Sequence, residues 1–71
     1  MKKVFKIEVD CANCANKIQE AVSKIDGVNS VTINFMTQKM IIDIDDDRFD
    51  EVFKIVVKTA KRVEPDFEVL N

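Results

Sequence analysis

Apolar and polar residues alternate in several short stretches of the chain. The first covers residues 3–9, and alternation of this kind indicates a strand with one buried face. Two more, at 31–35 and 40–44, are separated by a short turn at 36–38, so together they predict a hairpin. A last strand is expected to begin at Phe67, after the loop "EPD". The apolar positions that these stretches would bury are Phe5, Ile7, Val9, Val31, Ile33, Phe35, Met40, Ile42, Ile44, Phe67 and Val69.

Between the strands, apolar residues recur at the spacing of an amphipathic helix. The first helix is predicted to begin near Cys11 and to end at Gly27, because glycine commonly follows a helix. The second is predicted to begin at Asp47, which would cap it with Asp50 as its capping-box partner. Their apolar positions are Cys14, Ile18, Ala21, Val22 and Ile25, and then Phe49, Val52, Phe53, Val56 and Ala60. We expect Phe49, Phe53 and Met40 to be core residues.

The resulting order of elements is β-α-β-β-α-β. The two halves, residues 1–35 and 36–71, each read as a β-α-β unit. This order predicts a ferredoxin-like α+β fold, with a four-stranded antiparallel sheet and both helices on one face. With 71 residues, the chain is long enough for a single domain spanning 1–71.

Composition narrows the function classes. The net charge is −2, and no basic patch argues for nucleic acid as a partner. No apolar run approaches the ~20 residues of a membrane span, so we expect no direct membrane insertion of this segment. The chain has no histidine, which removes imidazole catalysis and histidine metal ligation. With two cysteines in "C-x-x-C" spacing, a reducing, cytosolic setting is expected.

The two cysteines, Cys11 and Cys14, fall between the first strand and the first helix, in the stretch "DCANC". The amide N–H groups and the dipole of a helix N-terminus favour an anion, so we expect the pKa of both thiols to be lowered. One interpretation is structural, with one buried and one incidental cysteine. A second is a dithiol redox pair. Against it, the chain is short for a thioredoxin-like fold, has no tryptophan and offers Pro65 as its sole proline.

The third interpretation is an open metal site. Two thiolates suit copper(I), zinc, cadmium or lead, and a site with two cysteine ligands suits transfer of an ion better than structural zinc, which is usually closed by four ligands. Asp10 can add a hard donor that favours a divalent ion over copper(I). Alternatively, Asp10 only caps the helix or places a charge in its first turn.

"DCANC", followed by "VSKIDGVNSVTINFMTQKMIIDID", resembles the heavy-metal-associated domain over about residues 4–70. Copper-handling members of this family typically carry Met-Thr before the first cysteine, whereas Asp10 is similar to the aspartate of bacterial zinc-, cadmium- and lead-exporting pumps. The resemblance implies binding of Cd²⁺, Zn²⁺ or Pb²⁺, and less readily Cu⁺, by Cys11, Cys14 and Asp10. It also implies the N-terminal module of a P-type ATPase, on the cytoplasmic face of a bacterial plasma membrane. The partners would be the metal ion and other domains or the membrane metal site of that ATPase, and two copies sharing one ion are a further expectation. A free-standing metallochaperone, for copper among other ions, is the alternative.

The departures from the family pattern matter as well. Val9 stands where the family usually has a methionine, so a looser metal loop is expected. In the family's fold the loop "VEPD" lies near the end of the first strand, so Glu64 is expected as a fourth ligand, with Asp66 as the alternative.

We expect no enzyme activity in this segment, because it has no nucleophile–base pair and none of the ATPase motifs. The acidic run "DIDDDRFDE" does not predict a calcium loop, because Arg48 stands where that loop needs glycine and Lys54 where it needs glutamate.

Overall fold

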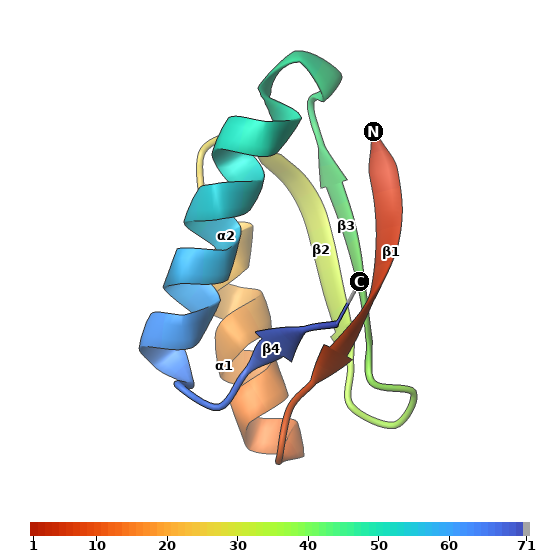
Figure 1. Cartoon of the computed structure of the whole chain (residues 1–71), viewed down its shortest axis with the longest axis vertical. Coiled ribbons are helices and arrows are strands. Elements are labelled where there is room, and N and C mark those ends of the chain that lie inside the picture. Colours follow the sequence, from red (N-terminus) through yellow and green to blue (C-terminus); the bar gives the residue numbers. More distant parts are fainter. Residues whose placement is uncertain (71) are drawn as a thin grey trace.

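A computed structural model describes residues 1–70 of the chain. Its elements follow the expected order, and Figure 1 shows their arrangement. The strands are β1 (Lys2–Glu8), β2 (Val28–Asn34), β3 (Lys39–Ile44) and β4 (Glu68–Val69). The α-helices are α1 (Ala12–Ser23) and α2 (Phe49–Val63), and a 3-10 turn (Asp46–Arg48) precedes α2.

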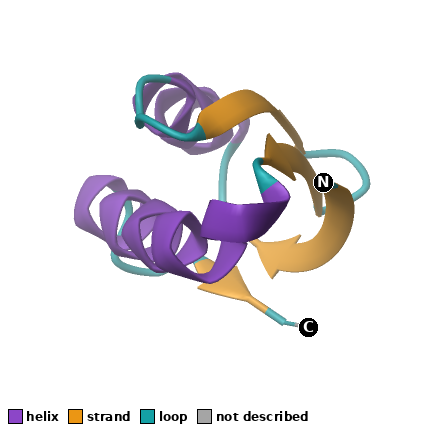
Figure 2. Cartoon of the chain, turned by 90° about the horizontal axis from the view of Figure 1, so that it is seen from above, coloured by secondary structure: helices purple, strands orange, loops and turns teal. Residues whose placement is uncertain are grey.

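The strands form one sheet in the order β2-β3-β1-β4, and each neighbouring pair is antiparallel. Seen from above, both helices lie on the same face of this sheet (Figure 2). Met40 of β3 lies between Phe5 of β1 and Ile33 of β2, so apolar residues at alternate positions share the face that the helices cover. The ferredoxin-like prediction is therefore confirmed.

One hydrophobic cluster joins the sheet to the helices. Met40 is fully buried, as predicted. Phe49 and Phe53 were expected in the core as well, but both are half-buried and pack against its edge, so that expectation is wrong. Their rings stack with Phe5, with 4.8 Å between the centroids of Phe5 and Phe53. Within the described residues, the pairing of β1 with β4 covers Ile7 and Glu8 and does not reach Phe5.

The first helix ends earlier than predicted. Helix α1 stops at Ser23, where the N–H of Lys24 turns back to Ala21 O at 3.3 Å. Gly27 lies in the following turn with a φ of +100°. A Cβ atom at Gly27 would lie 2.6 Å from Val52 Cγ2. Glycine is therefore required by this turn and by its close approach to α2, and the prediction that it ends the helix is wrong.

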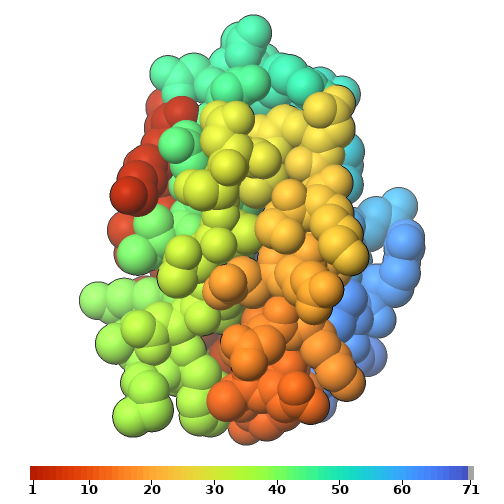
Figure 3. Space-filling model, turned by 180° about the vertical axis from the view of Figure 1, so that it is seen from behind, coloured from red at the N-terminus to blue at the C-terminus, as the bar shows by residue number. Residues whose placement is uncertain are grey.

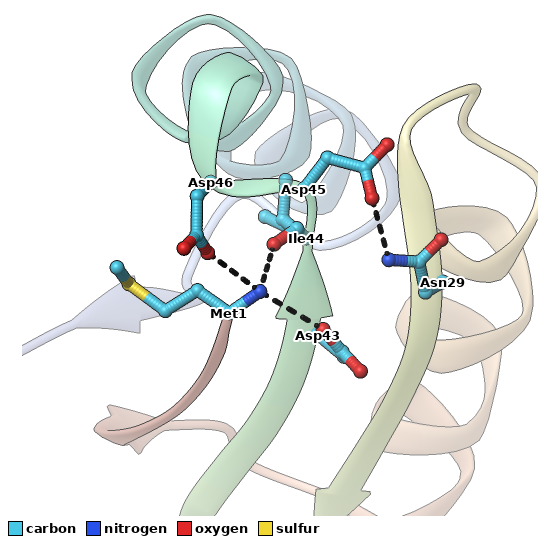
Figure 4. A network of polar contacts seen from close by, with 6 residues as sticks. All are labelled: Met1, Asn29, Asp43, Ile44, Asp45 and Asp46. Atoms are coloured by element: carbon cyan, nitrogen blue, oxygen red, sulfur yellow. Dashed lines mark hydrogen bonds and ion pairs between the residues drawn. The ribbon is translucent and has the colours of Figure 1, made fainter.

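The second helix is not capped as predicted. Asp47 lies inside the 3-10 turn, and the N-cap of α2 is Arg48, which makes no side-chain capping bond. Neighbouring residues of the acidic run make other contacts, shown in Figure 4. The Met1 ammonium pairs with Asp46 at 2.9 Å and Asp43 at 3.3 Å, and these carboxylates raise the pKa of the amino group. The run thus fastens the end of the molecule opposite the cysteine loop (Figure 1).

Candidate metal centre

Cys11 is the N-cap of α1. Its backbone is extended, with φ −148° and ψ 153°, and its Sγ accepts a hydrogen bond from the backbone N–H of Cys14 at 3.1 Å. The Cys11 carbonyl accepts the first helical bond, from the Ala15 N–H at 3.0 Å. The interpretation in which Asp10 caps the helix is therefore wrong, because the cysteine itself satisfies the free N–H at this helix end. Asp10 is exposed, one residue before the cap.

Cys14 lies in the first turn of α1, half-buried against the hydrophobic core. Both cysteines are free thiols. Hydrogen bonds from the Cys14 side chain and then from its backbone N–H lower the pKa of Cys11. Hydrogen bonds to Cys11 and then to Glu64 raise the pKa of Cys14 to about 12. The expectation that both thiols are acidified is correct for Cys11 and wrong for Cys14, because Cys14 is the proton donor to two acceptors.

Glu64 reaches the thiols from the far end of α2. It is the C-cap residue, and its N–H donates to Ala60 O at 2.9 Å. The Phe67 N–H donates to the Glu64 carbonyl at 3.0 Å, and the Phe67 side chain is fully buried. A core residue therefore anchors the short loop that carries Glu64, whose carboxylate helps to raise the pKa of Cys14.

The other two predicted carboxylates lie outside this contact. Asp66 is exposed, and its backbone N–H donates to Glu64 Oε1 at 3.4 Å. Neither Asp10 nor Asp66 is among the groups that perturb the two thiols. Over residues 1–70, no three cysteine, aspartate or glutamate side chains converge in the arrangement of a metal site. Glu64 is thus the carboxylate that raises the pKa of Cys14, and Glu64 and Asp10 as metal ligands both stay predictions.

One residue near the site carries no signal in the sequence pattern. The Val9 N–H, just before the metal loop, donates to Gln38 Oε1 at 2.8 Å. Gln38 lies in the β2–β3 turn, far from Val9 in the chain, so only the tertiary structure brings the two together.

The comparisons with known proteins agree with this fold. Residues 4–63 match the family of the heavy-metal-associated domain. The zinc/cadmium/lead-transporting P-type ATPase of Shigella sonnei is 42% identical over 52 residues, which cover 73% of this chain and 7% of that protein. A copper transport protein ATOX1 homolog of Dictyostelium discoideum is 29% identical over 58 residues, covering 82% of this chain and 87% of that protein. The N-terminal domain of PacS from Synechocystis superimposes with a TM-score of 0.71 at 23% identity, over 100% of this chain and 98% of that one.

The fold is that of a small α+β domain, and the chain belongs to the heavy-metal-associated domain family. The Shigella sonnei match lies within a small part of that protein, since the chain spans only 7% of its length. The family match, at residues 4–63, is to the heavy-metal-associated domain and to no ATPase catalytic domain. Within residues 1–70, neither helix has the length and apolar character needed to cross a membrane.

Proposed function

We propose that this domain binds one soft divalent cation, Cd²⁺, Zn²⁺ or Pb²⁺, through the thiolates of Cys11 and Cys14. The observation that carries the proposal is the pairing of the two cysteines at the start of α1, where Cys11 Sγ accepts the Cys14 backbone N–H at 3.1 Å and the Glu64 carboxylate helps to raise the pKa of Cys14. Two sulfurs with a nearby carboxylate are a donor set suited to a borderline or soft divalent ion. Binding replaces the Cys14 proton with the metal and frees Glu64 to become a ligand.

Asp10 supplies a further donor in this proposal. It is exposed and directly precedes Cys11, and its carboxylate is not needed as the helix cap, because Cys11 holds that position. A hard carboxylate adds negative charge and a coordination site for a divalent ion and offers less to copper(I). Discrimination among ions would then come from the number and type of ligands.

Copper(I) is the second candidate. Over residues 1–70 no third Cys, Asp or Glu is already in position with the two cysteines, and copper(I) is content with two thiolates. The ATOX1 homolog of Dictyostelium discoideum, a copper transport protein by name, supports this alternative, and the Shigella sonnei ATPase supports the divalent ions.

The likeness to the Shigella sonnei ATPase supports a role as the metal-binding module of a metal-exporting P-type ATPase in a bacterial membrane. In that setting the domain lies on the cytoplasmic face and passes its ion to another domain or to the membrane metal site, or reports the metal load. The catalytic steps would belong to the rest of such a protein. A free metallochaperone would make the same use of the open site, and two copies would be able to share one ion through it.

A cadmium titration tests the proposal. Charge-transfer absorbance between thiolate and metal reports binding, and a competing chelator sets the free ion concentration. We expect one ion per wild-type chain and no high-affinity site in Cys11→Ser/Cys14→Ser. A stoichiometry of one ion per two chains would indicate a metal-bridged dimer. Tight binding of one cadmium ion by the double variant would contradict the proposed thiolate site.

A further inference from the structure

Gln38 holds an unusual backbone conformation beside the metal loop. It is the last residue of the turn between β2 and β3, and its φ of +53° is in the left-handed region. In the described part of the chain it is the single residue other than glycine with a positive φ. Such a conformation is costly for a residue with a Cβ atom and persists when surrounding contacts hold it.

Three hydrogen bonds hold Gln38, and two of them reach the segment that leads to the cysteines. Its backbone carbonyl accepts from the Ile7 N–H at 3.0 Å. Its side-chain Oε1 accepts from the Val9 N–H at 2.8 Å, and its Nε2 donates to Phe35 O at 2.8 Å. Both ends of the amide are therefore used, which fixes its orientation.

The bond to Val9 falls where β1 stops. β1 ends at Glu8, so the N–H of Val9 has no partner in the strand ladder. Val9 is 5% exposed, and a buried N–H without an acceptor would be costly. Gln38 supplies that acceptor and so sets the direction in which the chain leaves the sheet toward Asp10 and Cys11. The hairpin and the start of α1 lie at the same end of the molecule (Figure 3).

We propose that Gln38 is a positioning residue for the metal loop. Its side chain ties the hairpin to the residue that precedes Asp10, so the loop carrying Asp10 and Cys11 is ordered before an ion arrives. Val9 was expected to leave a looser loop than methionine, and the amide of Gln38 offsets that loss by holding the backbone directly. Ordering a binding loop in advance lowers the entropy lost on binding. The inference rests on the proposed function, because it assigns Gln38 a role in the same site.

The test separates the side chain of Gln38 from its backbone. Asn and Gly both tolerate a positive φ, so Gln38→Asn and Gln38→Gly keep the turn, but neither can reach Val9. Asn34→Ala is the matched control, since Asn34 Oδ1 accepts the N–H groups of Met36 and Thr37 within the same hairpin and has no bond to Val9. For each protein we would measure the Val9 amide hydrogen exchange without metal, the melting temperature and the cadmium dissociation constant.

We expect both Gln38 variants to speed Val9 exchange and to weaken cadmium binding by roughly three- to tenfold, the loss of one hydrogen bond. Because Gln38→Gly relieves the positive φ, its melting temperature should fall less than that of Gln38→Asn. Asn34→Ala should lower the melting temperature and leave cadmium affinity unchanged. The inference would be overturned if both Gln38 variants had the same Val9 exchange rate and the same cadmium affinity as the wild type. If the wild-type chain bound no cadmium, the proposed function and the metal role of Gln38 would fail together, and the exchange data would still decide whether Gln38 holds Val9.

Discussion

Cys11 Sγ accepts a hydrogen bond from the backbone N–H of Cys14 at 3.1 Å, so one proposed metal ligand is also the cap of the helix that carries the other. The sulfur atom satisfies a free N–H at the start of α1, where the helix dipole favours negative charge. The sulfur of Cys11 therefore serves both as the cap of the helix and as a proposed metal ligand. Substitutions at Cys11 can be chosen to separate the two roles.

The variants Cys11→Ser and Cys11→Ala should differ in stability but not in metal binding. Serine is among the preferred N-cap residues, and replacing such a cap by alanine typically costs about 1 kcal/mol. We therefore expect Cys11→Ser to keep the free energy of unfolding of the metal-free protein and Cys11→Ala to lower it, as measured by urea denaturation. Both should lose tight cadmium binding. A Cys11→Ala protein as stable as the wild type would show that the thiol contributes nothing as a cap.

Metal affinity should rise with pH. The pKa of Cys14 is raised to about 12, so at neutral pH its proton must leave when the ion binds. The pKa of Cys11 is lowered. In the pH range in which Cys11 is already a thiolate, binding releases one proton per ion, and the affinity changes by about tenfold per pH unit. The slope should approach two protons per ion once Cys11 is protonated as well. Cadmium titrations from pH 5.5 to 8.5 measure this, and a pH-independent affinity would contradict thiol ligation.

Glu64 and Asp66 form a matched pair for testing the fourth ligand. They share one loop, and of the two it is Glu64 that raises the pKa of the Cys14 thiol. We expect Glu64→Gln to weaken cadmium binding by about tenfold, or ~1.4 kcal/mol, and Asp66→Asn to leave it unchanged. In the metal-free protein, Glu64→Gln should also lower the pKa of Cys14, because an anionic acceptor is removed; thiolate absorbance at 240 nm reports this. A larger effect from Asp66→Asn would reverse the assignment.

Gly27→Ala should destabilise the fold without affecting the site. The new Cβ would lie 2.6 Å from Val52 Cγ2, and the backbone there has a φ of +100°. Strain and overpacking of this kind cost roughly 1–3 kcal/mol each in the free energy of unfolding. Lys24→Ala, which removes only the exposed ion pair with Glu20 at 3.8 Å, should change stability by less than about 0.5 kcal/mol. Urea denaturation of the two variants provides the comparison, and equal stabilities would mean that the turn relaxes freely.

The sequence predicted the fold through its strands, because alternation places one face of each strand against the helices. Helix ends were harder to predict. The apolar spacing up to Ile25 looked helical, yet Ile25 packs against the core from a turn after Ser23. Asp47 looked like a cap, but it lies inside a 3-10 turn, next to Asp46, which pairs with the Met1 ammonium.

Only the part of the site formed by residues close together in the sequence could be predicted. The spacing of Cys11 and Cys14 and their place before a helix can be read directly from the chain. Cysteine as the N-cap could not be, because cysteine is not a typical capping residue. The raised pKa of Cys14 depends on Glu64 as well as on Cys11, and Glu64 is brought there by α2 and the buried Phe67. Gln38 was not visible for the same reason, since its partner Val9 is distant in sequence.

The most direct test of the central claim is a competition of cadmium, zinc and copper(I) for the wild-type domain and for Asp10→Ala. Chelators buffer each free ion, and thiolate charge-transfer absorbance reports occupancy. The account predicts that Asp10→Ala weakens cadmium and zinc by about tenfold or more, ~1.4 kcal/mol, and spares copper(I). Equal affinities of the two proteins for all three ions would contradict the role of Asp10 as a ligand and would favour copper(I) bound by Cys11 and Cys14 alone.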